Sequence, residues 1–565
     1  MAEADLAWRV LAIPGRAFCA ARRRCLEGWL LGLRTAEFAT LSVFVLVASL
    51  ASFYHEPWSD EAQAWLIARD LSIPQMFSLM TYEGSPPLWH LLLKALIGLH
   101  LPYGALGVVS ITLMSGAMYL WLRWSPLPRL LRLLMPFAFY FQYQYAVVAR
   151  SYALSIFLAF TAAWLWREGV RRMVLLGVIL ALLVETNLYG FVMGAGIALA
   201  FACEYWRELK NKASRRRKIE IAIALVVLAA SCLIAAALAR PSSDSSSAAG
   251  TTLNTQVKTA DAFSLTSRAR SGEDVLYKSL GLSSSWKVAA LMLLVVWTIG
   301  IKNRIHYALP LVLTALVIWQ GRMLTSLWEE GLLVLLLFWF LRARKLHCAL
   351  PFVFTVLSLG LIWARHQHYG MALAALAISL WMSWPAPSSV QHPANSTFTL
   401  QTALMFALVL QLPGTLAAVV HEIREPYSGA TAAAEYIRPY VGKHPIYAFT
   451  FFPVGLQPYF AGNIYVNQSE TPWVWSKTSE NRVKAPLLAG MEAGAMAVVV
   501  SAGNSTGPLV RPLDTMLSQQ QMRSTHAFCG RMFWFETESE IECFEIYEKR
   551  AQAAVATEPR QSVLH

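Results

Sequence analysis

Charged residues are scarce in this sequence. Asp, Glu, Lys and Arg make up 14% of its 565 residues, whereas 56% are hydrophobic. This composition excludes a soluble protein with a single core and is typical of a polytopic membrane protein. Acidic residues number 34 against 47 basic ones, which gives a net charge of +13. The basic residues lie in short clusters between apolar runs, as in a membrane protein, so we expect no nucleic-acid partner.

Cysteine is also scarce, and no cleavable signal peptide is recognisable. The seven cysteines form no CxxC pair and no Cys/His spacing, which argues against a zinc site. Cys529 and Cys543 are placed where two adjacent strands would pair them, but the sequence leaves a disulfide between them open. The Arg-rich first 35 residues lack a small-residue cleavage site, so we expect the first span to remain as an anchor.

Long apolar runs dominate the rest of the chain. A spanning helix needs about 20 apolar residues. About thirteen runs qualify, at 37–54, 103–124, 131–148, 151–166, 173–186, 188–206, 219–239, 286–301, 305–320, 322–341, 347–364, 370–384 and 399–420. The segment 86–101 is not counted, because it is short and carries His90, Lys94 and His100; we expect a helix lying in the membrane interface there. The fold class is therefore an all-α polytopic membrane protein with about 11–13 transmembrane helices.

The basic clusters predict the orientation in the membrane. With a cytoplasmic N terminus, every cluster, from the six Arg of residues 1–37 to "RARK", falls inside. The chain is then expected in the plasma (bacterial inner) membrane with its C terminus outside. The expected organisation is a cytoplasmic segment 1–36, a transmembrane domain 37–420 with external loops 55–85 and 240–285, an extracytoplasmic α/β domain 421–550 and a disordered tail 551–565.

Ionisable and polar residues collect on the predicted outer face. They are costly in or beside spans, so their clustering indicates function. Besides the acidic loop after the first span, they are Arg150, Asn187, Tyr189, Arg365, His366 and His368. Carboxylates facing several cations in apolar walls suit a phosphorylated lipid substrate and a proton-accepting base. In the acidic loop, Glu56, Asp70 and Glu83 are expected to be structural or substrate-orienting.

Three motifs in order resemble a known family. They are "WSDEAQAWLIARD", "YEGSPPLWHLLLK" and "ARSYALSIFLAF". Together they resemble C-type glycosyltransferases, which include the protein O-mannosyltransferases and the lipid A aminoarabinose transferase. The resemblance covers mainly residues 37–206. It implies transfer of a sugar from a polyprenyl-phosphate donor to an acceptor hydroxyl on the external face.

The resemblance also implies residue roles. Asp60 matches the general base, and Glu61 matches its companion. Arg150 and Tyr152 match the Arg-x-Tyr-x-Leu signal near the donor phosphate, while His90 and Lys94 lie on the juxtamembrane helix that edges the site. We assign Lys94, Arg365, His366 and His368 to phosphate binding with Arg150 and Tyr152, and Glu83, His90, Asn187 and Tyr189 to substrate orientation.

Two departures from the family pattern concern metal and donor. Ser85 replaces a histidine before the Pro-Pro pair, and Gln144 stands where some relatives have a carboxylate. Divalent cations prefer several carboxylate oxygens, so we expect no metal or other cofactor, with a divalent cation left open. The sugar is open, as is the acceptor, which is a lipid, a glycan or a protein. The alternatives are a transporter or flippase and a polysaccharide polymerase or ligase.

Overall fold

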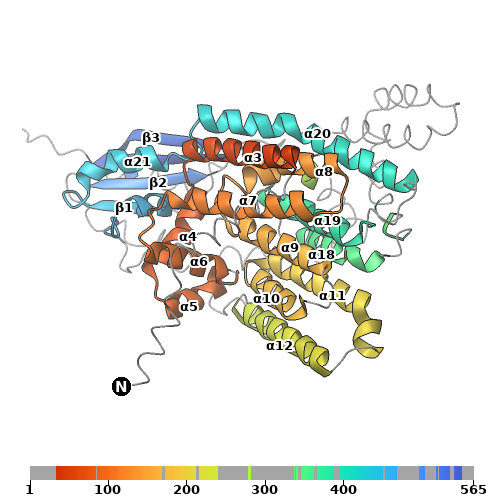
Figure 1. Ribbon diagram of the computed structural model, residues 1–565. Coiled ribbons are helices and arrows are strands. Elements are labelled where there is room, and N and C mark those ends of the chain that lie inside the picture. Colours follow the sequence, from red (N-terminus) through yellow and green to blue (C-terminus); the bar gives the residue numbers. More distant parts are fainter. Residues whose placement is uncertain are drawn as a thin grey trace, which may run out of the picture.

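The structure is a computed structural model of a helical bundle with a small sheet at one end (Figure 1). It describes residues 34–83, 85–167, 172–211, 215–238, 278–281, 336, 339–341, 345–361, 366–385, 395–449, 452–467, 495–502, 517–518, 521–534 and 540–549. The helices are α3 (Thr35–Tyr54), α4 (Ser59–Asp70), α5 (Ile73–Glu83), α6 (Leu88–Gly98), α7 (Ala105–Trp124), α8 (Arg129–Leu134), α9 (Ser151–Arg167), α10 (Met173–Val184), α11 (Leu188–Asn211), α12 (Arg215–Leu238), α18 (Leu350–Leu361), α19 (Tyr369–Ser383), α20 (Asn395–Arg424) and α21 (Ala430–Ile437).

Several helices meet the length and composition of a membrane span. Among the described residues, five are long and apolar enough: α3, α7, the first part of α11, most of α12 and most of α20. Shorter apolar helices include α6, α10 and α19. The predicted fold class is therefore confirmed: the chain is a helical membrane protein. The predicted runs 286–301 and 305–320 lie outside the described residues, as does most of 322–341.

Aromatic side chains fill the centre of the bundle. The Trp121 ring of α7 lies 5.6 Å from that of Trp381 on α19 and 5.7 Å from that of Phe160 on α9, measured between centroids. Elsewhere small residues let helices approach closely: a Cβ added to Gly177 of α10 would lie 2.7 Å from the Cβ of Ala224 on α12. Close backbone approach of this kind is how helices pack where lipid removes the hydrophobic driving force.

The predicted span 131–148 is not a regular helix. Pro136 lies in a 3-10 turn after α8, and a π turn follows at Tyr140–Gln144. Proline lacks an N–H and ends the α-helical ladder. The segment nevertheless runs along α3, because Arg132 Nη2 lies 3.1 Å from Glu37 Oε1 at its start and Gln142 Nε2 donates to the Phe44 carbonyl at its middle. The prediction of one continuous helix was wrong, because the chain passes along α3 as an interrupted helix.

The predicted loop 55–85 is mostly helical. It folds into α4 and α5, and α6 follows as the expected short helix over Leu88–Gly98. Glu61 caps the start of α4 by accepting the Trp58 N–H. Lys94 of α6 donates to carbonyls at the end of α4. These helices pack beside the sheet end of the bundle (Figure 1). The predicted loop 240–285 lies outside the described residues except for 278–281.

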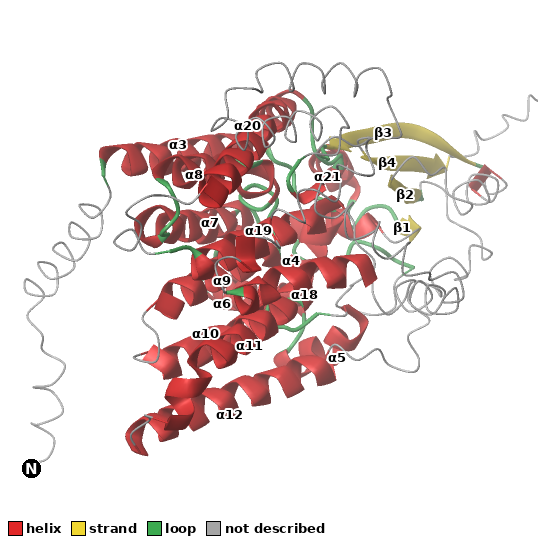
Figure 2. Ribbon diagram, turned by 90° about the vertical axis from the view of Figure 1, so that its right-hand side faces the viewer, coloured by secondary structure: helices red, strands yellow, loops and turns green. Residues whose placement is uncertain are grey.

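The C-terminal part forms the expected small α/β unit. Its strands are β1 (Ile446–Phe449), β2 (Met496–Ala502), β3 (Met522–Met532) and β4 (Glu540–Lys549), in the order β1-β2-β4-β3. β1 and β2 are parallel, and β4 is antiparallel to both of its neighbours. Helix α21 packs with this sheet (Figure 2). The predicted boundary at 421 falls inside α20, which continues to Arg424, so the unit begins after that residue.

The disulfide that the sequence left open is present. Cys529 of β3 and Cys543 of β4 are directly paired in the strand register, with their Cα atoms 4.0 Å apart. Trp534, just after β3, is buried and its ring packs against that of Trp58. The N-terminal residues 1–33 and the tail 551–565 lie outside the described residues.

Candidate functional site

Helix α4 begins with the two acidic residues that the motif singled out. The Trp58 N–H donates to Glu61 Oε2 at 3.2 Å, which caps the first turn. Asp60 and Glu61 both lie in that turn, where the helix dipole favours negative charge. The two side chains then separate: Glu61 is 1% exposed, whereas the Asp60 side chain is 23% exposed. Of the pair, Asp60 is the one that a substrate can reach.

Arg150 binds Asp60 directly. Its Nη1 forms a short ion pair with Asp60 Oδ2, and its side chain is 25% exposed. The guanidinium also lies 5.8 Å from the Trp58 ring centroid and 5.6 Å from that of Tyr152. Aromatic faces favour a cation at this distance. Two motifs that are 90 residues apart therefore meet in one charge pair at the start of α4 and of α9.

Glu83 and His90 lie within the electrostatic reach of this pair. Glu83 accepts a hydrogen bond from Gln63 Nε2 at 2.8 Å. Burial raises the pKa of Glu83 to about 7, although the Gln63 bond and the Arg150 charge oppose the shift. Burial, assisted by the Arg150 charge, lowers the pKa of His90 to about 4. At neutral pH, His90 is therefore uncharged and Glu83 is partly protonated.

His90 Nδ1 is a buried polar atom beside the site. The residue is 5% exposed, and Nδ1 has no hydrogen-bond partner among the described residues. Buried polar atoms are nearly always paired with protein, water or ligand. The orienting role predicted for His90 remains a prediction, and this nitrogen is the atom that would serve it.

A group of rings continues the site from Arg150. Tyr152 of α9 lies 5.8 Å from the His368 ring, and Tyr189 of α11 lies 5.1 Å from it, between centroids. Three elements that are far apart in sequence thus bring Arg150, Tyr152, His368 and Tyr189 together. Arg365 and the side chain of His366 lie outside the described residues.

Two predicted substrate contacts have structural partners instead. Lys94 Nζ donates to the carbonyls of Ala68 and Leu71 at 3.1 and 2.6 Å. It therefore caps the end of α4, about 12–16 Å along the helix from Asp60 at 1.5 Å per residue. In the structure this ammonium satisfies the free carbonyls of a helix end. That Lys94 binds phosphate stays a prediction.

Asn187 is likewise held by its own chain. Its Nδ2 donates to Ser151 Oγ and Ser155 Oγ at 3.0 and 2.8 Å. Its Oδ1 accepts from the Gly190 N–H at 2.9 Å, which caps α11. The amide therefore ties α11 to α9, and the predicted orienting role stays a prediction.

Sequence reasoning missed a buried network behind Asp60. His55 Nε2 lies 3.0 Å from Glu61 Oε2, and His55 Nδ1 lies 2.6 Å from Glu422 Oε1. Tyr143 donates its hydroxyl to the other oxygen of Glu422. The sequence did carry a signal, because His55 directly follows the apolar run 37–54 and Glu422 comes just after the apolar run 399–420. Nothing in the sequence paired residues 367 positions apart.

The sheet reaches the same helix turn through Glu542. This residue of β4 is 0% exposed and accepts hydrogen bonds from Ser59 at the start of α4 and from Ser428. Burial raises its pKa to about 7, although the two serine hydroxyls oppose the shift. The small α/β unit is thereby fixed directly to the turn that carries Asp60.

One group of side chains in the described part of the chain has the geometry of a metal site. Glu204, His347 and Cys348 place their ligand atoms within 4.8 Å of one another. Lys345 Nζ lies 3.3 Å from Glu204 Oε1 and already compensates that carboxylate. The group is about 25 Å along α11 from Asn187 at 1.5 Å per residue, so it belongs to the opposite end of the bundle. Metal-independent chemistry at Asp60 stays a prediction.

Comparison with known proteins gives one structural neighbour to report. No protein-family model matches the chain, and no curated protein matches it. The chain is similar to a crystal structure of ArnT from Cupriavidus metallidurans bound to undecaprenyl phosphate, at 14% sequence identity and a TM-score of 0.44. The alignment covers 92% of this chain and 98% of that chain. At this identity and TM-score the similarity carries no functional conclusion for this chain.

Proposed function

We propose that this protein is a membrane glycosyltransferase. It would move a sugar from a polyprenyl-phosphate donor to an acceptor hydroxyl on the extracytoplasmic face. The observation that supports it is the Asp60–Arg150 pair, in which two of the three motifs meet at a partly exposed position. The first turn of α4 offers a carboxylate, and the adjacent guanidinium offers the donors that match phosphate oxygens.

The reaction is a single displacement at the anomeric carbon. Asp60 accepts the proton of the acceptor hydroxyl as its oxygen attacks, and the bond from the anomeric carbon to the phosphate oxygen breaks. Arg150 holds the charge of the departing phosphate, which needs no general acid because phosphate is already a good leaving group. The transition state has oxocarbenium character, and attack from the opposite face inverts the anomeric centre.

The ion pair gives this mechanism an order of binding. In the structure the Asp60 carboxylate is bound to the Arg150 guanidinium. A donor phosphate competes with Asp60 for Arg150 and so releases the carboxylate. We therefore expect the donor to bind before the acceptor hydroxyl is activated. Tyr152, Tyr189 and His368 would line the donor side, while Glu83 and His90 would contact sugar or acceptor hydroxyls.

The test uses purified protein in detergent with a panel of polyprenyl-phosphate sugars and acceptors. Wild-type protein should transfer or hydrolyse at least one donor, and Asp60→Asn should remove that activity. If no donor reacts but reconstituted protein moves lipid-linked or small polar substrates across liposomes, the protein is a transporter or flippase and the proposal is wrong.

A further inference from the structure

The Asp60–Arg150 pair is assembled from two separate segments, so something must hold them in register. Glu61 is the link. Its Oε2 accepts the Trp58 N–H, which fixes the turn that carries Asp60. Its Oε1 accepts the Ala149 N–H at 2.7 Å, which fixes the residue before Arg150. One carboxylate therefore bonds to the chain on both sides of the pair.

Glu61 is 1% exposed, and a buried anion is costly unless a cation and hydrogen bonds accompany it. His55 supplies the charge. Its side chain is 4% exposed, and both ring nitrogens lie within 3.0 Å of a carboxylate oxygen, one on Glu61 and one on Glu422. Both nitrogens can donate only when the ring is protonated. Burial by itself would lower the pKa of His55, but the charges of Glu61 and Glu422 raise it to about 10.

Further side chains contact His55 and Glu422. The Tyr427 ring lies 4.7 Å from the His55 ring, and Glu56 also interacts electrostatically with the imidazole. Tyr143 donates its hydroxyl to Glu422 from the π turn before Arg150. Glu422 comes from the last turn of α20, so His55 bonds α20 to the first turn of α4.

Building on the proposed function, we propose that His55 and Glu422 are positioning residues for sugar transfer. They hold Glu61 as an ordered anion, and Glu61 holds Asp60 and Arg150 at the separation that the reaction needs. Neither residue touches the Asp60–Arg150 pair. The structure thus assigns function to two residues that lie outside the three sequence motifs and that sequence reasoning passed over.

The test compares His55→Gln and Glu422→Gln with His421→Gln as the matched control. His421 is the neighbour of Glu422 on α20, but its Nε2 contacts the Arg531 carbonyl of the sheet. Each test variant should lower kcat by about tenfold to a hundredfold, as misplacement of reacting groups by about 1 Å does. The control should keep kcat within about twofold. His55→Gln and Glu422→Gln should melt below the control, because each leaves a buried charged partner uncompensated; kcat is therefore measured well below the melting temperature of every variant.

The double variant separates positioning from general loss of stability. His55 and Glu422 act through one contact, so His55→Gln with Glu422→Gln should lose little more activity than either alone. Additive losses, or unchanged kcat in both single variants, would overturn the proposal.

A second measurement does not depend on any donor. Amide hydrogen exchange of the segment 145–150 should accelerate in His55→Gln and not in His421→Gln, because the Ala149 N–H loses its ordered acceptor. If wild-type protein transfers no sugar, the proposed function fails, and this exchange experiment still decides whether His55 holds the segment. Equal exchange in the wild type and His55→Gln would refute the positioning role.

Discussion

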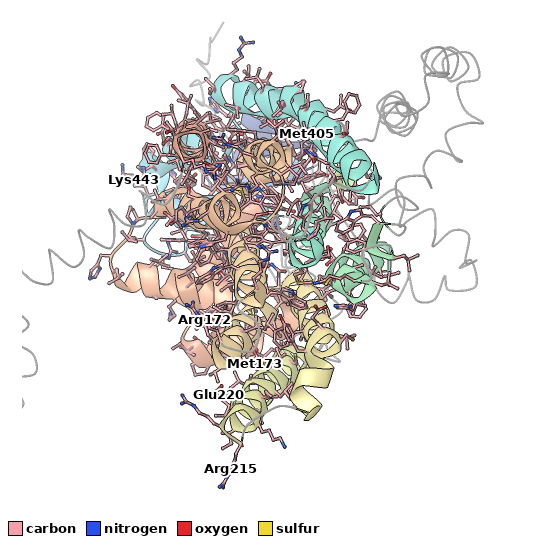
Figure 3. The ribbon with its side chains drawn as sticks, turned by 45° about the vertical axis from the view of Figure 1, so that its right-hand side comes forward. Arg172, Met173, Arg215, Glu220, Met405 and Lys443 are labelled. Carbon is pink, nitrogen blue, oxygen red and sulfur yellow. A yellow bond between two sulfur atoms is a disulfide. The ribbon has the colours of Figure 1, made fainter. Side chains whose placement is uncertain are left out.

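The two ends of the helical bundle treat their carboxylates differently. At the end away from the sheet, Glu37 lies near Arg132, Glu204 near Lys345 and Glu220 near Arg216, each pair within 3.3 Å. Figure 3 shows Arg215 and Glu220 on α12 at this end. At the sheet end, Glu61, Glu422 and Glu542 are all buried and receive hydrogen bonds from backbone N–H groups, hydroxyls or His55.

This difference shows what each end is built for. Arg and Lys pairs fix the carboxylate charge and suit the end whose basic residues are predicted to face the cytoplasm. Hydroxyls and amides satisfy a carboxylate without fixing its charge, and burial then raises the pKa of Glu83 and Glu542 to about 7. Partly exposed ion pairs at the sheet end include Arg69–Asp70 and Arg150–Asp60, and the second is the one that joins two of the motifs.

Among substitutions that test the difference between the two ends, Asp60→Asn should have the largest effect. Asp60→Asn removes the proton acceptor while keeping the size of the side chain, so kcat should fall about 10²- to 10⁴-fold, the usual contribution of a general base. Initial rates with saturating donor and acceptor measure it. Full activity in the variant would mean that another group accepts the proton.

Arg150→Gln should have the next largest effect, and a different signature. Loss of the guanidinium removes a phosphate contact in both the bound donor and the transition state, so KM for the donor should rise and kcat should fall, each by about tenfold or more. Varying the donor concentration separates the two constants. A change in the KM of the acceptor alone would mean that Arg150 contacts the acceptor and not the donor phosphate.

The sheet end should also show a pH-dependent stability that Glu542 controls. The folded protein retains the Glu542 proton up to about pH 7, whereas the ordinary pKa is 4.5. The folded state therefore binds more protons between these values, and the unfolding free energy falls as pH rises from about 5 to 8, by roughly 3 kcal/mol for this group. Glu542→Gln should reduce the slope and leave the part that Glu83 contributes, as thermal melts across this pH range will show. An equally steep slope in the variant would assign the effect elsewhere.

The smallest effect is expected at the opposite end. Glu204→Gln removes a partly exposed pair with Lys345, and such pairs contribute about 0–1 kcal/mol. Transfer activity should stay within about twofold of wild type, and the melting temperature should change little. A large loss of activity would remove the distinction between the two ends.

The sequence predicted this arrangement where local patterns decide it. Apolar runs located most of the helices, and alternation located the α/β unit. Asp60 and Arg150 were found from motifs, and the structure brings them together. Patterns did not show contacts that depend on a distant partner: Lys94 caps α4, and Asn187 ties α11 to α9. His55 and Glu422 show the same limit, because their pairing joins residues 367 positions apart.

The most direct measurement counts both products of one reaction. Purified wild type, Asp60→Asn and Glu204→Gln are each incubated with a polyprenyl-phosphate sugar and an acceptor, and the glycosylated acceptor and the released polyprenyl phosphate are quantified together. The account predicts equal amounts of the two products for wild type and Glu204→Gln, and loss of both for Asp60→Asn. Undiminished formation of both products by Asp60→Asn would contradict it.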